Sequence, residues 1–160
     1  MSERGEKYME QITDNMQKYT NYKTQMGRLK KALSYQFYLE AIFIEYAIIE
    51  DRLESVLRHG GNWNPKPGTF PSLDFKRKKI AKLAEERKNP IRKYFPVELT
   101  DSIEVWKNER NRVIHALMKQ SLHTEDLSKI AREGEILTKL ICNKSTQYNR
   151  ALERLADKEK

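Results

Sequence analysis

The sequence has few of the features that stabilise secreted proteins or carry a chain into a membrane. It contains one cysteine, Cys142, so no disulfide can form within one chain, which fits a reducing, cytoplasmic environment. The N-terminal segment has no apolar run behind its charges and does not resemble a signal peptide. The most apolar stretch, residues 37–57, is interrupted by charged residues such as Glu45 and Arg52. It therefore predicts a buried helix and no membrane partner.

The sequence also lacks the motifs of several common phosphate, redox and metal sites. The chain has no Gly-rich phosphate loop, no C-x-x-C pair and no H-E-x-x-H sequence. Its three histidines, His59, His115 and His123, are far apart and lack the spacing of metal ligands. We therefore expect neither a bound metal ion nor a cofactor.

Positive charge is in excess. Lys and Arg number 31 against 23 Asp and Glu, which gives a net charge of +8. A basic protein attracts polyanions such as nucleic acid, nucleotides or an anionic membrane surface, although the same charge can serve solubility alone. Four adjacent basic residues, 76–79, are interpreted as solvated charges on a short helix.

Glycine and proline gather in two breaks, at residues 58–71 and 88–96. Outside these breaks, apolar residues recur at spacings of three and four, and no segment shows the strict alternation of a strand. The sequence therefore predicts an all-α protein. The expected helices cover about residues 3–26, 29–59, 73–87, 97–119 and 124–154. Residues 1–27 would form an N-terminal helical arm, and residues 28–157 a helical domain.

The predicted helix at residues 29–59 is apolar on two sides. Its first stripe contains Ala41 and Ile48, and its second contains Ile49 and Leu53. A helix of this kind is typical of the centre of a bundle or of a dimer interface.

The segment E-R-N-R-V-I-H-A-L, residues 109–117, places polar residues among apolar ones. Asn111 and His115 share one face of the predicted helix, because they are four residues apart. Arg110 lies at the border of the apolar stripe, where a guanidinium needs a partner or a ligand. An alternative remains open, in which Arg110 extends to water and His115 is an ordinary surface residue. The core-facing residues are expected to be Leu99, Ile103, Trp106, Val113 and Leu117.

The sequence R-N-R-V-I-H, Arg110 to His115, resembles the R-N-x-x-x-H form of the R-x4-6-H motif of the HEPN superfamily. This superfamily consists of small all-α domains. Its members include ribonuclease toxins, anti-phage abortive-infection proteins and the RNA-cleaving modules of CRISPR effectors. The resemblance covers roughly residues 29–155. Arg52 and His59 also fit the loose motif, but we discount them because they end a helix before Gly60.

The resemblance implies an HEPN-like antiparallel bundle of about five helices that forms a symmetric dimer. It implies metal-independent cleavage of RNA that leaves a 2′,3′-cyclic phosphate and a 5′-hydroxyl, in a toxin or in anti-phage defence. The residues that would act in catalysis are Arg110, Asn111 and His115. The residues that would bind RNA are Lys107, Arg112 and Lys119.

The spacing of the motif bears on the dimer. Arg110 and His115 are five residues apart, which is about 140° around a helix, so they do not point the same way. A two-fold dimer, as in the family, would bring two copies of the motif together. In the branch of the family paired with a nucleotidyltransferase antitoxin, a tyrosine follows the histidine by two, where this chain has Leu117. An antitoxin partner stays open, as do an inactive HEPN-like RNA- or nucleotide-binding domain and a plain helical interaction protein.

Overall fold

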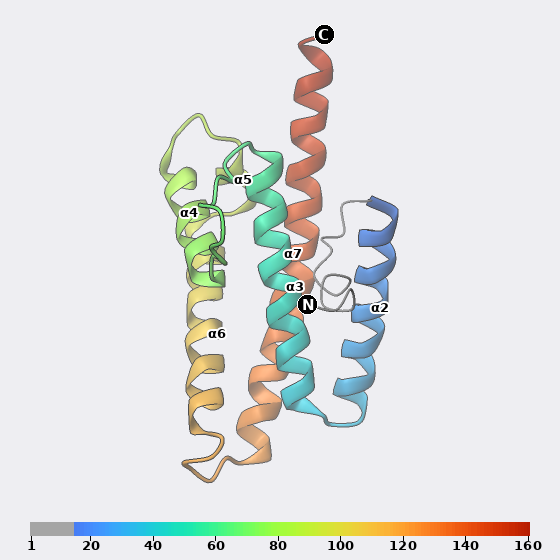
Figure 1. Ribbon diagram of the computed structural model, residues 1–160, viewed down its shortest axis with the longest axis vertical. Coiled ribbons are helices and arrows are strands. Elements are labelled where there is room, and N and C mark those ends of the chain that lie inside the picture. Colours follow the sequence, from blue (N-terminus) through green and yellow to red (C-terminus); the bar gives the residue numbers. More distant parts are fainter. Residues whose placement is uncertain (1–14) are drawn as a thin grey trace.

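The chain is all-α, as its periodicity predicts. The computed structural model describes residues 15–160, which contain six helices and no strand (Figure 1). The helices are α2 (Asn15–Ser34), α3 (Tyr38–His59), α4 (Leu73–Glu85), α5 (Ile91–Tyr94), α6 (Val97–Ala116) and α7 (Thr124–Lys158). Within residues 15–160, no helix combines the length and the apolar character needed to span a membrane.

Helix α3 lies at the centre of the bundle. It packs against α7, α2 and α4, while α6 packs against α4 and α7 on the side away from α2 (Figure 1). This position explains its two apolar stripes, because each stripe is covered by a different neighbour. Fully buried core side chains from these helices include Leu29, Ile42, Ile49, Leu53, Leu57, Ile80, Ile103 and Ile141.

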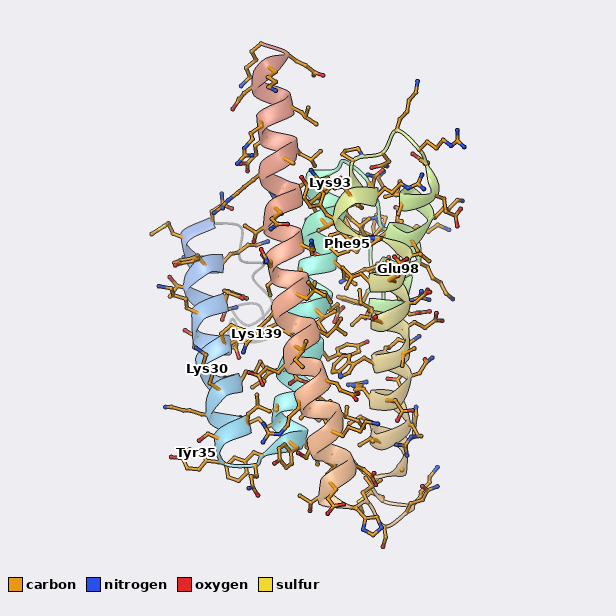
Figure 2. The ribbon with its side chains drawn as sticks, turned by 180° about the vertical axis from the view of Figure 1, so that it is seen from behind. Lys30, Tyr35, Lys93, Phe95, Glu98 and Lys139 are labelled. Atoms are coloured by element: carbon orange, nitrogen blue, oxygen red, sulfur yellow. The ribbon has the colours of Figure 1, made fainter. Side chains whose placement is uncertain are left out.

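The helix predicted over residues 29–59 is two helices. Helix α2 ends at Ser34, and Tyr35 lies at the turn that follows (Figure 2). Gln36 adopts a φ of 59°, the Phe37 N–H donates to the Ala32 carbonyl at 2.8 Å, and the Gln36 N–H donates to the Leu33 carbonyl at 3.2 Å. This is the Schellman arrangement that closes helices, usually with glycine in place of Gln36. The prediction was wrong here because glutamine gives no sequence signal for it.

The N-terminal arm was predicted for residues 1–27. Residues 1–14 lie outside the described residues, and the remainder belongs to α2, which is continuous across residues 27 and 28. Helix α2 packs on α3 through the buried side chains Leu29, Ala32 and Leu33. The division into an arm and a domain stays a prediction.

Helix α4 begins where the sequence indicates, after the proline-rich loop. The Ser72 hydroxyl accepts a hydrogen bond from the Phe75 N–H at 3.1 Å and so caps its first turn. The interpretation of residues 76–79 as solvated charges is wrong for two of them. Lys76 is 4% exposed and its ammonium lies 3.1 Å from Glu50, while Arg77 is 6% exposed and lies 3.2 Å from Glu104. Both are ion pairs between helices, because α4 lies across the acidic edges of α3 and α6.

Helix α6 is slightly shorter than predicted. It ends at Ala116, so Leu117 lies in the turn after the helix and is only partly buried. The other four residues of the expected stripe, Leu99, Ile103, Trp106 and Val113, are buried. The short helix α5, which the sequence did not predict, fills the break before α6.

Candidate functional site

The motif helix is anchored to α7. The indole N–H of Trp106 donates to the backbone carbonyl of Ile130 at 3.0 Å, and both residues are buried. Val113 is also buried, so the apolar side of α6 faces the core along its length. This orientation determines where the polar residues of the motif point.

Arg110 is partly buried against α3. Its guanidinium carbon lies 4.2 Å from the centroid of the Tyr46 ring and 5.5 Å from that of Phe43. Arg110 Nη1 donates to Asn111 Oδ1 at 3.0 Å, while Nε is buried without a hydrogen-bond partner. No carboxylate of residues 15–160 forms an ion pair with this side chain. The positive charge of Arg110 is therefore held by aromatic rings and left unneutralised.

Tyr46 connects this arginine to the start of α4. The backbone N–H of Leu73, in the first turn of α4, donates to the Tyr46 hydroxyl. Burial raises the pKa of Tyr46, and the nearby Arg110 charge and the Leu73 hydrogen bond act against that rise. The phenol is therefore neutral and fixed at both its ring and its hydroxyl.

Asn111 and His115 lie on the neighbouring face of α6, as the i, i+4 spacing predicts. Asn111 is partly buried and accepts the hydrogen bond from Arg110, whereas His115 is exposed. The structure thus brings Arg110 and Asn111 together. It does not bring His115 to Arg110 within one chain, because Arg110 turns towards α3 while His115 faces solvent.

The three predicted RNA-binding residues differ in their surroundings. Lys107 Nζ lies 2.8 Å from Asp74 Oδ1, and its side chain is 13% exposed, so it joins α6 to α4. Arg112 is exposed and paired with Glu109 at 3.0 Å. Lys119 is exposed in the turn after α6. Arg112 and Lys119 are accessible to a large ligand, while Lys107 is largely engaged.

Asp74 gathers the positive charges between α4 and α6. Hydrogen bonds from Lys107, Arg77 and Lys78 hold the pKa of the Asp74 carboxyl well below its usual range. This carboxylate neutralises the cations around it and holds the start of α4 beside the middle of α6. Asp74 does not extend this neutralisation to Arg110.

Two acidic residues of α3, Glu40 and Glu45, lie on the helix that packs against Arg110, and neither forms an ion pair with it. Glu40 is exposed, and Glu45 is 0% exposed with neither carboxyl oxygen hydrogen-bonded. Glu45 lies against Gly134 of α7, where a Cβ would overlap its carboxyl group. Burial, with a smaller contribution from Glu135, raises the pKa of Glu45 to about 9, so this side chain is uncharged at neutral pH.

The sequence did not predict that the rings of Phe43 and Tyr46 contact Arg110. The signal for this contact is the pair Phe43 and Tyr46, three residues apart on the central helix, where an aromatic pair is usually assigned to the core. Phe43 is in fact 51% exposed.

No group of three or more His, Cys, Asp or Glu side chains within residues 15–160 is arranged to hold a metal ion. Comparisons of the chain with protein-family models, with curated proteins and with solved structures found no match.

Proposed function

We propose that the chain is a metal-independent endoribonuclease of HEPN type, which acts as a cytoplasmic toxin or in anti-phage defence. The observation that carries the proposal is the state of Arg110. A guanidinium that is partly buried, clamped by two rings and left without a carboxylate is prepared to bind an anion. It lies on the same helix as Asn111 and an exposed His115.

In the proposed reaction, the ribose 2′-hydroxyl attacks the adjacent phosphorus and the bond to the 5′-oxygen of the next nucleotide breaks. One His115 accepts the proton from the 2′-hydroxyl, and a protonated histidine returns a proton to the leaving 5′-oxygen. An imidazole can both accept and donate a proton near neutral pH, which suits both steps. Arg110 stabilises the charge that grows on the phosphate oxygens, and Asn111 orients the guanidinium through its hydrogen bond.

A second copy of the chain completes this site, because one chain presents Arg110 and His115 in different directions. The exposed side of α6 offers a surface for the contact. Val105, Ile136 and Leu140 are 64%, 70% and 41% exposed and line a groove of about 460 Å³ between α6 and α7. Val105 and Arg112 are seven residues apart and point within about 20° of each other. A copy seated on Val105 therefore lies on the same side of α6 as Arg112, with His115 about 80° further around the helix.

Two basic side chains beyond the reacting groups would also bind the RNA. Arg112 and Lys119, both accessible, would contact phosphates on either side of the cleaved bond. The charge of +8 favours association with RNA at low ionic strength.

Expression in bacterial cells tests the biological side of the proposal. Wild-type protein should arrest growth and Arg110→Ala should relieve the arrest at equal protein level. Arg87→Ala removes an exposed arginine from the turn after α4 and should leave the arrest intact. Equal growth with all three proteins would contradict a toxin role. RNA binding by wild type without any cleavage would instead support the inactive binding domain.

A further inference from the structure

A second groove lies on the other side of the bundle, among α2, α3 and α7. It has a volume of about 590 Å³. Its basic lining residues are Lys18, Arg52, His59, Lys139 and Arg150, and none of the lining residues in the described part of the chain, 15–160, is acidic. Lys139 projects from α7 towards α2 (Figure 2). Helix α6, which carries Arg110, lies on the opposite side of α3 (Figure 1), so the two sites are separate.

The positive charge of this groove is only partly neutralised. Arg52 is paired with Asp51, and Lys139 lies 2.7 Å from Glu135, yet neither carboxylate belongs to the lining. Lys18 and Arg150 form no ion pair with any carboxylate of residues 15–160. The groove therefore attracts an anion through cations that come from two different helices.

One residue of the groove lining, Asn149, has an acceptor without a donor among residues 15–160. Asn149 Nδ2 donates to the Ser55 hydroxyl at 3.2 Å, and this bond fixes the amide. Asn149 Oδ1 is buried and has no hydrogen-bond partner within residues 15–160. An unsatisfied buried acceptor is costly, so it favours a ligand that supplies an N–H or O–H.

Two tyrosines of α2 supply flat surfaces beside these groups. Tyr22 is partly buried, its hydroxyl donates to the Cys142 sulfur, and the Arg52 guanidinium lies 5.9 Å from its ring centroid. Tyr19 lies at the rim and is 55% exposed. An exposed tyrosine ring beside cationic side chains suits stacking by a planar base.

We propose that this groove binds a phosphorylated nucleoside. Arg150 and Lys18 hold the phosphate, an amino or hydroxyl group of the nucleoside donates to Asn149 Oδ1, and the base stacks on Tyr19. A groove of a few hundred Å³ accommodates one such unit. A free nucleotide and the phosphorylated end of an RNA strand present the same chemistry. The site stands on its own residues and is independent of the proposed cleavage at Arg110.

Calorimetric titration with AMP, adenosine and inorganic phosphate tests the proposal on the full chain. AMP should bind more tightly than either fragment. Arg150→Glu should weaken AMP binding by about tenfold or more, since a charge-assisted contact is replaced by repulsion. Arg154→Glu makes the same charge change one turn further along exposed α7 and should alter binding by less than about twofold. An equal loss of AMP affinity in both variants would show that binding depends only on the overall charge of the protein, and would overturn the proposed site.

Asn149→Leu separates the nucleoside contact from the phosphate contact. It should weaken AMP binding while leaving the weak binding of inorganic phosphate unchanged. If wild type binds phosphate as tightly as AMP, the groove is a plain anion site and the nucleoside assignment is wrong.

Binding of one RNA oligonucleotide, prepared either with a 5′-phosphate or with a 5′-hydroxyl, distinguishes the two sources of the ligand. The binding is measured on the His115→Ala protein. Preference for the phosphorylated strand, lost in Arg150→Glu, assigns the groove to RNA ends. Binding of AMP with no such preference assigns it to free nucleotides. Absence of both would overturn the proposal.

Discussion

The guanidinium carbon of Arg110 lies 4.2 Å from the ring centroid of Tyr46, and the hydroxyl of that tyrosine accepts a hydrogen bond from the first turn of α4. Three helices therefore determine the position of one arginine. The ring lowers the cost of keeping the charge partly buried, and no carboxylate of the described chain neutralises it.

Removing the Tyr46 ring should weaken the proposed RNA cleavage without removing a group that would act in it. Tyr46→Leu should lower the rate of RNA cleavage by roughly 2- to 30-fold, because a cation–π contact contributes about 0.5 to 2 kcal/mol. Tyr46→Phe keeps the ring and loses only the hydrogen bond to Leu73. It should retain most of the activity in the same single-turnover assay. If Phe and Leu are equally impaired, the hydroxyl positions the site and the stacked ring does not.

The proposed site is shared by two chains, so mixing intact and inactive chains should lower the activity by more than the fraction of inactive chains. Wild type and His115→Ala, co-expressed in equal amounts and purified together, should show about a quarter of the wild-type activity. This follows because only dimers with two intact chains, about one in four, hold both histidines. An activity of about one half would mean that each chain carries a complete site. Sedimentation at micromolar concentration supplies the control that both preparations are dimeric.

The buried Glu45 predicts a pH dependence of stability. Its pKa is about 9 in the folded chain and near 4.5 when exposed, so the folded state retains the proton through this range. The free energy of unfolding should therefore fall as the pH rises from about 4.5 to about 9, by about 1.4 kcal/mol per pH unit from this group. Above about pH 9 the dependence ends, because both states have lost the proton.

Glu45→Gln removes the titrating proton at nearly the same volume. Urea unfolding of wild type and variant at pH 6 and pH 8 measures the difference in stability. The advantage of the glutamine variant should grow with pH. A constant difference would show that Glu45 is not buried as a neutral acid. Glu40→Gln, on the exposed side of α3, is the control and should show little dependence.

Gln36, between α2 and α3, has a left-handed backbone conformation, so we expect a stabilising substitution at this position. Gln36→Gly should raise the free energy of unfolding by about 0.5 to 1 kcal/mol, because glycine adopts a φ near 59° without the Cβ clash. Gln36→Ala keeps the Cβ and should gain nothing. Thermal unfolding of the three proteins measures the order, and equal stability of the Gly and Ala variants would contradict this account.

Periodicity in the sequence was sufficient for the helical class and for most of the core. Four of the five residues expected on the core side of α6 are buried, and the two stripes of α3 correspond to its central place. Spacing alone also placed Asn111 and His115 on one face. These features follow from local geometry, which a single sequence contains.

Contacts between helices were not predictable in the same way. Lys76 and Arg77 are buried because Glu50 and Glu104 happen to face them from other helices. A run of basic residues carries no sign of such partners. The unpartnered Glu45 is similar, since the space that it occupies exists only because residue 134 of α7 is a glycine.

The pair Arg52 and His59 shows the same limit at a candidate site. The sequence marked them as the end of a helix, which is correct for His59 at the end of α3. The structure adds that both line the groove with Arg150, a residue far along the chain. Only the packing of α2, α3 and α7 reveals that shared surface.

The most direct test of the proposed function is RNA cleavage in the presence of EDTA by wild type and by His115→Ala. Wild type should cleave RNA under these conditions and leave 2′,3′-cyclic phosphate and 5′-hydroxyl ends. His115→Ala should lower the cleavage rate by about 100-fold or more while keeping the wild-type circular dichroism spectrum, since the proposed role of His115 is proton transfer and its side chain is exposed. Equal trace activity in the two proteins, or cleavage that EDTA abolishes, would contradict the proposed function.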